Sequence, residues 1–161
     1  EFEIGLYCTF EYKRFDLSFQ LFYSHGAEII NGAKAFAYQT ARHRDLLFQW
    51  QPANAESDIP SLRRNGSHPN FQTWSDQFLE DGTYLRLRNI TIGYNVPLDI
   101  IKNRNETLRI YFSAQNILTI TDYSGFDPEI GFTGGNFFNR GVDQGNYPVS
   151  RRIIGGLQFN F

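Results

Sequence analysis

The sequence predicts an all-β protein, an antiparallel transmembrane β-barrel segment whose strands are joined in part by two long extracellular loops. The first observation is that apolar residues alternate with polar or small ones in several stretches, which gives each strand two different faces. The second is that short and long connections between these stretches take turns along the chain. The third is a closing strand that ends on an aromatic residue. Strands with lipid on one face and a water-filled lumen on the other satisfy all three.

The composition fits strands of this kind within a longer protein. Of the 161 residues, 17% are aromatic, and Met is absent even at position 1, so we expect a piece cut from a longer chain. No stretch approaches the ~20 consecutive apolar residues of a membrane helix. Alternating strands keep the mean hydropathy low, here −0.42. The formal net charge of −2 predicts no special affinity for nucleic acid.

The first two expected strands, residues 2–12 and 15–25, form a hairpin with a very short connection. Lys13–Arg14 suits a tight polar turn between two stretches that alternate cleanly. Phe22 breaks the polar face of the second strand. The apolar face carries Phe2, Ile4, Leu6, Cys8, Phe10, Tyr12, Phe15, Leu17, Phe19, Leu21 and Tyr23.

Residues 26–82 are the first expected long loop. The alternation is lost there, and glycine, proline and polar residues punctuate the stretch. Ala33–Trp50 contains sparsely spaced apolar residues that suit a short helix. Loops of this length are uncommon inside compact domains and are often functional.

The third expected strand, residues 83–97, changes face part of the way along. Its apolar residues have odd numbers before Asn89 and even numbers after it. A slip of one residue moves side chains to the opposite face, so the sequence predicts a bulge or face change near Asn89. Pro97 ends the strand.

The fourth and fifth expected strands, residues 106–120 and 151–161, are separated by a second long loop, residues 121–150. The connections therefore run short, long, short, long, as in barrels with short periplasmic turns and long external loops. The fifth strand follows a long loop, so it should run inward and end at the periplasmic rim. Both short turns then fall on that same side, which a soluble sandwich would not require.

Several stretches match one known family in combination. Residues 82–97 read GTYLRLRNITIGYNVP, residues 109–119 read RIYFSAQNILT, and residues 121–129 read TDYSGFDPE. Further matches are the loop phrases at 50–54 and 58–60, Pro148 before Arg151–Arg152, and the closing Phe159 and Phe161. Together they resemble two late barrel strands, the following loop and the C-terminus of SusC/RagA family TonB-linked outer-membrane transporters of Bacteroidetes.

The resemblance implies a plugged barrel of about 22 strands, of which this chain would supply the last five. It also implies import of oligosaccharides or oligopeptides across the bacterial outer membrane, with a SusD-like surface lipoprotein as partner and TonB acting through the missing N-terminal part. A carboxypeptidase-like domain, a TonB-contact segment and a plug are then expected upstream of Glu1. The lipid bilayer would surround the apolar face, and the outer-membrane insertion machinery would read Phe159 and Phe161 as an insertion signal.

No catalytic constellation is visible, so the sequence predicts no enzyme, no cofactor and no metal centre. His25, His43 and His68 are scattered without the spacing of metal ligands. Cys8 has no base nearby in sequence and is interpreted as a small apolar filler.

Three acidic residues, Asp122, Asp127 and Glu129, crowd the beginning of the second long loop. Their oxygens are of the type that calcium prefers, but their spacing is not that of an EF-hand. A turn built by Gly125 and Asp127-Pro128 is the favoured interpretation.

Two further sets of residues are candidate contacts for a substrate or partner. Loop aromatics suit stacking on a sugar or peptide, although packing against neighbouring loops or the lipoprotein is the favoured interpretation. They are Tyr123, Phe126, Phe132, Phe137, Phe138 and Tyr147. Polar positions of the third and fourth strands would line the lumen, where contact with plug or substrate and simple solvation are equally favoured. They are Arg86, Arg88, Arg109, Tyr111 and Gln115.

A soluble carbohydrate-binding β-sandwich is the main alternative, because it also has alternating strands and aromatic loops. It would bury its apolar faces in one core between two sheets. A barrel segment of five strands cannot close and keeps two open edges, so alone it should not be stable.

The isolated chain therefore separates the two hypotheses. In buffer without detergent we expect it to aggregate and to show no cooperative urea unfolding, because its apolar strand faces have no partner. Size-exclusion chromatography with light scattering, followed by a urea titration, measures both properties. A monomeric chain that unfolds cooperatively in plain buffer contradicts the barrel hypothesis.

Overall fold

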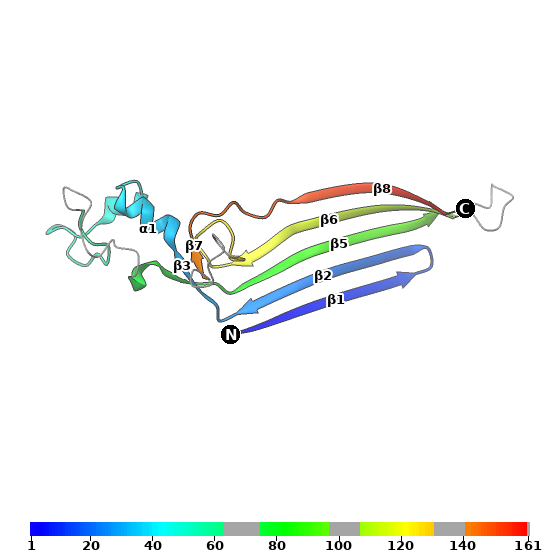
Figure 1. Cartoon of the computed structure of the whole chain (residues 1–161), viewed down its shortest axis with the longest axis horizontal. Coiled ribbons are helices and arrows are strands. Elements are labelled where there is room, and N and C mark those ends of the chain that lie inside the picture. The colour runs from blue at the N-terminus through cyan, green and yellow to red at the C-terminus, as the bar shows by residue number, and fades with distance from the viewer. Residues whose placement is uncertain (63–74, 97–106, 131–140, 161) are drawn as a thin grey trace. The chain divides into compact units, whose positions relative to one another are not determined.

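The computed structural model describes residues 1–62, 75–96, 107–130 and 141–160 of the chain, which divides into two compact units (Figure 1). We call the first the sheet unit; it comprises Glu1–Gly26, Thr83–Asp122 and Val149–Phe161. We call the second the loop unit; it comprises Ala27–Gly82 and Tyr123–Pro148, which nearly coincide with the two expected long loops.

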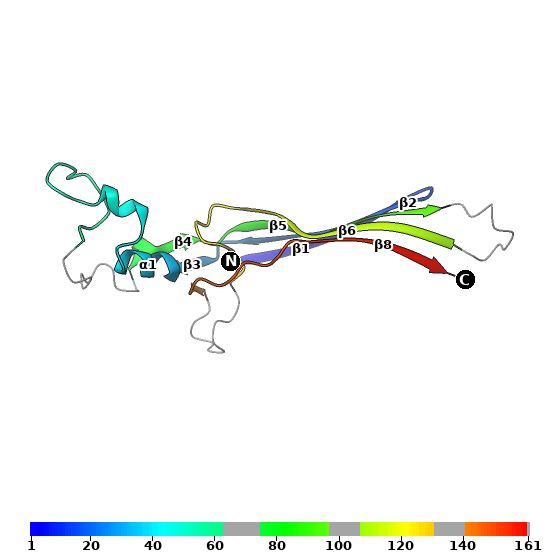
Figure 2. The same cartoon turned by 90° about the horizontal axis from the view of Figure 1, so that it is seen from above.

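The sheet unit contains a five-stranded antiparallel sheet in the order β1-β2-β5-β6-β8. The strands are β1 (Phe2–Tyr12), β2 (Phe15–His25), β5 (Tyr84–Val96), β6 (Thr107–Thr121) and β8 (Arg152–Asn160). Each bound lies within one residue of its expected position, and the predicted all-β antiparallel fold class is confirmed. Figures 1 and 2 show the strands side by side in a single layer, with β1 and β8 at its two edges.

One face of this sheet is apolar and exposed. Phe10 is the Cα partner of Leu17, Leu17 of Ile92, and Ile92 of Phe112, so the apolar positions line up across four strands. Such a surface is unusual for a soluble monomer but is what a lipid-facing strand presents. The exposed large side chains on it are Phe2, Ile4, Leu6, Phe10, Tyr12, Phe15, Ile92, Ile110, Phe112, Leu118, Ile120, Ile153, Leu157 and Phe159.

The irregularity predicted near Asn89 is present and falls at Arg88. Leu87 and Asn89 pair with consecutive residues of β2, so Arg88 between them is skipped. The pairing of β5 with β6 shifts at the same level, where Asn116 has a left-handed φ of 52°. The extra residue places Ile90 on the same sheet face as Leu87, which explains the change of parity in the sequence.

The loop unit has secondary structure of its own, which the sequence analysis did not anticipate beyond a short helix. A small sheet has the order β4-β3-β7, with β3 antiparallel to β4 and parallel to β7. No helix among the described residues is long and apolar enough to cross a membrane. The elements are β3 (Glu28–Asn31), α1 (Gly32–Gln39), η1 (Arg44–Phe48), η3 (Asp76–Phe78), β4 (Leu79–Asp81) and β7 (Val142–Asp143).

A small core holds the helical part of the loop unit together. Ala35 and Tyr38 of α1 pack with Leu46 of η1 and Phe78 of η3, all buried. Asn31 caps the N-terminus of α1, because its side-chain oxygen accepts a hydrogen bond from the backbone N–H of Lys34 at 2.9 Å. The partly buried Ile59 and Leu62 pack against the same core.

An arginine substitution tests which face of the sheet meets lipid. If the apolar face meets lipid, Phe112→Arg on that face should cost the full-length protein about 2–4 kcal/mol, because it puts a charge into hydrocarbon. Ser18→Arg on the opposite face is the matched control and should cost far less. The amount of folded, heat-modifiable protein in membrane fractions measures the difference. Equal losses for both variants would contradict the assignment of the faces.

Candidate lumen face and loop site

The face of the sheet opposite the apolar one carries most of the expected lumen residues. The register places Arg86 opposite Thr119 and Gln115 opposite Asn89, all on this polar face. Arg109 and Tyr111 of β6 share it. The structure thus brings the polar positions of the third and fourth strands together, and their exposure to a lumen stays a prediction.

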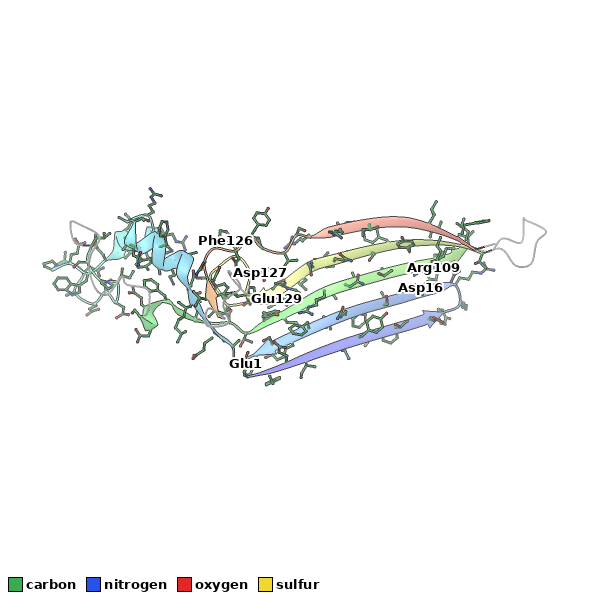
Figure 3. The ribbon with its side chains drawn as sticks, viewed as in Figure 1. Glu1, Asp16, Arg109, Phe126, Asp127 and Glu129 are labelled. Carbon is green, nitrogen blue, oxygen red and sulfur yellow. The ribbon has the colours of Figure 1, made fainter. Side chains whose placement is uncertain are left out.

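An ion pair crosses this face between strands that are not neighbours (Figure 3). The guanidinium of Arg109 on β6 donates from both Nε and Nη2 to the carboxylate of Asp16 on β2, with an Nε–Oδ1 distance of 2.9 Å. Strand β5 lies between them and presents Gly93 at this level. A Cβ on Gly93 would collide with both charged side chains, so a residue without a side chain is required there.

A second glycine receives an aromatic ring in the same way. Tyr111 on β6 is the Cα partner of Gly156 on β8, and a Cβ on Gly156 would collide with its ring. The Arg109 guanidinium lies 5.4 Å from the centre of the same ring. Two glycines, one on each of the strands that flank β6, therefore provide the room in which Arg109 and Tyr111 lie across the sheet.

The remaining two arginines contact aromatic rings near the bulge. Arg86 is only 3% exposed; its Nε donates to Thr119 Oγ1 at 3.1 Å, and its guanidinium lies 5.3 Å from the centre of the Tyr84 ring. The Arg88 guanidinium lies 3.8 Å from the centre of the Phe22 ring. This cation–π contact accounts for the large apolar residue that interrupts the polar face of β2.

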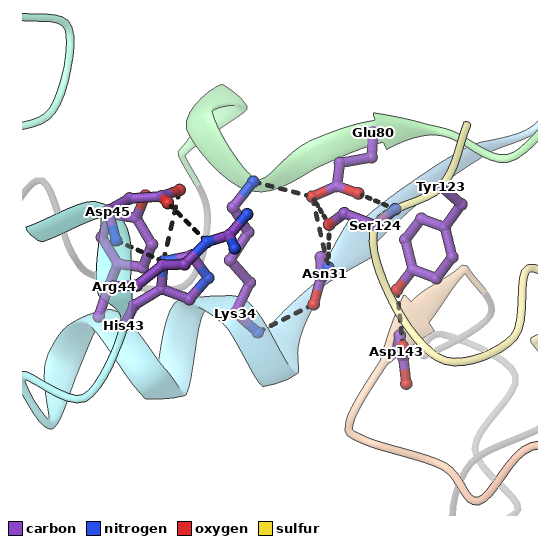
Figure 4. Close-up of polar contacts among 10 residues, drawn as sticks. Asn31, Lys34, His43, Arg44, Asp45, Glu80, Tyr123, Ser124 and Asp143 are labelled. Atoms are coloured by element: carbon purple, nitrogen blue, oxygen red, sulfur yellow. Dashed lines mark hydrogen bonds and ion pairs between the residues drawn. The ribbon is translucent and has the colours of Figure 1, made fainter.

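In the loop unit, Glu80 of β4 joins the two long loops (Figure 4). Its carboxylate accepts hydrogen bonds from the backbone N–H of Ser124 at 2.9 Å and from the Ser124 hydroxyl at 2.8 Å. It also accepts from Lys34 Nζ at 3.0 Å and from Asn31 Nδ2 at 3.3 Å. Burial alone would raise the pKa of Glu80, but the hydrogen bonds from Ser124 and Lys34 outweigh it and hold that pKa below its usual value.

Tyr123 and Asp143 form a buried contact in this unit. The Tyr123 hydroxyl donates to Asp143 Oδ2 at 2.6 Å, and both residues are almost fully buried. Burial, and then the hydrogen bond to Asp143, raise the pKa of Tyr123. Asp143 Oδ1 accepts from the backbone N–H groups of Gly145 and Asn146 at 2.8 and 3.2 Å.

The loop aromatics named from the sequence fall into three groups. Tyr123 is buried, so its ring supports the loop and is not presented to a ligand. Phe126 and Tyr147 are 73% and 92% exposed, respectively, and are free to meet a substrate or a partner. Phe132, Phe137 and Phe138 lie outside the described residues.

The three acidic residues at the start of the second loop do not converge on a metal site. Asp127 Oδ1 accepts from the backbone N–H of Glu129 at 2.9 Å, and the Ile130 N–H bonds to the Pro128 carbonyl at 3.0 Å, as in a turn. Throughout the described residues, no group of three or more His, Cys, Asp or Glu side chains could hold a metal ion. Phe126, Asp127 and Glu129 are labelled in Figure 3.

The two described histidines have different neighbours. His25 lies beside Tyr23 on β2, with 3.4 Å from its Nδ1 to the Tyr23 hydroxyl, whereas His43 is beside Asp45 in the loop unit. Phe159 is exposed on the apolar face. His68 and Phe161 lie outside the described residues, so the proposed role of Phe159 and Phe161 in insertion stays a prediction.

Sequence reasoning missed the carboxylates that organise these contacts, namely Asp16, Glu80 and Asp143. Their partners are far away in sequence: 93 positions separate Asp16 from Arg109, and 44 separate Glu80 from Ser124. One signal was present, because an isolated glycine on the polar face of a strand, such as Gly93, often marks a close approach by another group.

Comparison with curated proteins gives matches along the whole chain. TonB-dependent receptor P3 of Formosa agariphila is 34% identical over 174 residues, which cover 100% of this chain and 16% of that protein. TonB-dependent receptor SusC of Bacteroides thetaiotaomicron is 25% identical over 169 residues, which cover 98% of this chain and 15% of that protein. The chain thus spans about one sixth of the length of these relatives. No family model matches it.

Two solved structures are also similar to this chain over almost its whole length. The RagAB peptide importer in its open-open state superposes with a TM-score of 0.79 and 29% identity, over 99% of this chain and 17% of that one. The structure of the RagAB peptide transporter gives a TM-score of 0.74 at 29% identity, over 99% of this chain and 16% of that one.

A methyl group tests the space that Gly93 leaves for the ion pair. Gly93→Ala in the full-length protein should cost about 1–3 kcal/mol of unfolding free energy, because the Asp16 and Arg109 side chains must move. Gly155→Ala is the control, since nothing lies within 4 Å of a Cβ built there. Urea unfolding of the full-length protein in lipid vesicles measures both changes in stability. A Gly93→Ala variant as stable as Gly155→Ala would rule out the packing described.

Proposed function

Since the chain belongs to the SusC/RagA type of TonB-dependent receptors, we propose that it forms part of the barrel wall of an outer-membrane importer. Its strands β1, β2, β5, β6 and β8 cross the bacterial outer membrane with their apolar face toward lipid and their polar face toward the lumen. The loop unit lies outside the cell. The observation that carries this proposal is the sheet itself, with exposed large apolar side chains on one face and arginine, tyrosine and hydroxyl groups on the other.

The proposed substrate is an oligosaccharide or an oligopeptide. The similar solved structures are named as a peptide importer, and one curated relative is SusC. Exposed aromatic rings such as Phe126 and Tyr147 suit either class, because both sugars and peptides present surfaces that stack on rings. The work done on the substrate is binding and gated release, with no bond made or broken.

The proposed partners follow from the same family. A SusD-like surface lipoprotein would act at the extracellular side, and TonB would supply energy through a part of the receptor outside this chain. The outer-membrane insertion machinery would recognise the strand with Phe159 and Phe161, because a strand edge offers backbone groups to a pairing partner.

On the lumen face, the chain would contribute fixed charges and hydrogen-bonding groups. Arg109 is already paired with Asp16, and Arg86 bonds to Thr119, so both guanidinium groups are held in place before a ligand arrives. Arg88, Tyr111 and Gln115 complete the proposed lumen set. Side chains held in this way lose little conformational entropy when a plug or substrate contacts them.

Uptake by whole cells tests the proposal. A strain lacking the full-length gene should lose import of one class of labelled oligosaccharide or oligopeptide, and the wild-type gene should restore it. A gene without the TonB-contact segment should restore surface expression, measured by antibody labelling, but no import. Import at the wild-type rate without that segment, or in the deletion strain for every oligosaccharide and oligopeptide tested, would refute the proposal.

A further inference from the structure

Two carboxylates, the partly buried Glu80 and the buried Asp143, bind residues that come shortly before the two exposed aromatic residues of the second loop in sequence. Glu80 holds both the backbone N–H and the hydroxyl of Ser124, two positions before Phe126. Asp143 holds the backbone N–H groups of Gly145 and Asn146, and Asn146 immediately precedes Tyr147. Each exposed ring is therefore presented by backbone that a carboxylate of the loop unit fixes in place.

The two carboxylates are also linked to each other through one side chain. The Tyr123 hydroxyl donates to Asp143 Oδ2 at 2.6 Å, and the next residue, Ser124, is the one that Glu80 binds (Figure 4). Asp143 is 2% exposed, and the Glu80 side chain is 14% exposed. The hydrogen bond from Tyr123 to Asp143 is buried, and a charge-assisted hydrogen bond shielded from water is stronger than an exposed one.

Backbone pairing anchors the same region to the first loop. Asn31 of β3 is the Cα partner of Asp143 of β7, and the Ile30 N–H donates to the Gly141 carbonyl at 2.8 Å. Asn31 also donates to Ser124 Oγ at 3.1 Å and so contacts both ends of the network. The backbone next to both exposed rings is thus tied to β3 and β4 of the first loop.

We propose that Glu80 and Asp143 are positioning residues, which hold Phe126 and Tyr147 where the receptor captures its substrate. They act through Ser124, Tyr123 and the turn at Gly145, and neither carboxylate touches the ligand. The inference rests on the proposed import function for its second half, while the fixing of the loop backbone stands on the contacts of the loop unit alone.

The charge of Glu80 gives this arrangement a defined pH dependence. Four groups donate to its carboxylate: the Lys34 ammonium of α1, the Asn31 amide of β3, and the backbone amide and hydroxyl of Ser124. The charge of Glu80 also acts electrostatically on the Tyr38 and Tyr123 hydroxyls. The pKa of Glu80 is lowered in the folded state. Its contribution to stability is therefore present above the usual value of about 4.3 and is lost as the pH falls through the lowered folded pKa.

Hydrogen exchange in the full-length receptor tests the positioning without any ligand. Glu80→Gln and Asp143→Asn should each speed amide exchange in peptides covering residues 121–130 and 141–148 by about tenfold, because each loses a charged acceptor of backbone N–H groups. Glu56→Gln, at an exposed position of the same unit, is the control and should leave both peptides unchanged. Unchanged exchange in both carboxylate variants overturns the proposal.

Binding of the substrate tests the second half of the proposal, which is that Phe126 and Tyr147 are held where the receptor captures its substrate. The probe is the labelled peptide or oligosaccharide that wild-type cells import in the uptake experiment, and its affinity for purified receptor is measured from pH 7 to pH 3. Glu80→Gln should weaken binding at pH 7, and its affinity should change less between pH 7 and pH 3 than that of the wild type. Glu80→Asp, which keeps the charge, should recover part of the affinity.

The two failures can be told apart. If exchange rises in the variants but the affinity stays at the wild-type value, the carboxylates do not position a capture site and the inference is wrong. If wild-type cells import no labelled probe, the proposed import function fails, while the exchange experiment still decides whether Glu80 and Asp143 fix the loop.

Discussion

The alternation of side chains between the two faces of the strands is the constraint on which the rest of the sheet depends. If the register of a strand slipped by one residue, arginine and aspartate would lie on the face where the structure has phenylalanine and leucine. The pairing of Phe10, Leu17, Ile92 and Phe112 across four strands keeps one face apolar throughout. Along β5 the alternation shifts by one residue at Arg88, which the pairing with β2 skips. With the faces fixed, the polar side chains have only one side on which to meet.

The sequence was sufficient for the strands because alternation is a local signal that needs no knowledge of partners. It located all five strands of the sheet, and the change of parity at Asn89 correctly indicated the bulge. The loop unit was beyond this kind of reasoning, since strands as short as Val142–Asp143 and Leu79–Asp81 contain no detectable period. Their formation depends on pairing with Glu28–Asn31, which only the folded chain brings beside them.

The candidate site shows the same division between local and distant information. Residue type and face were enough to name Arg86, Arg109 and Tyr111 as one polar set, although their role in a lumen remains a proposal. Aromatic type was not enough for Tyr123, because only the buried hydrogen bond to Asp143 reveals that its ring is committed to the interior. The sequence pattern does not identify carboxylates such as Glu80, because their partners come from another loop.

The ion pair that lies over Gly93 limits the substitutions that this protein can accept during evolution. Asp16, Gly93 and Arg109 lie on three strands but occupy one volume, so none of the three can be replaced without altering the demands on the other two. A descendant that gains a side chain at position 93 should be rescued by shortening or neutralising its neighbours at 16 and 109. We therefore expect these three positions to covary among related sequences.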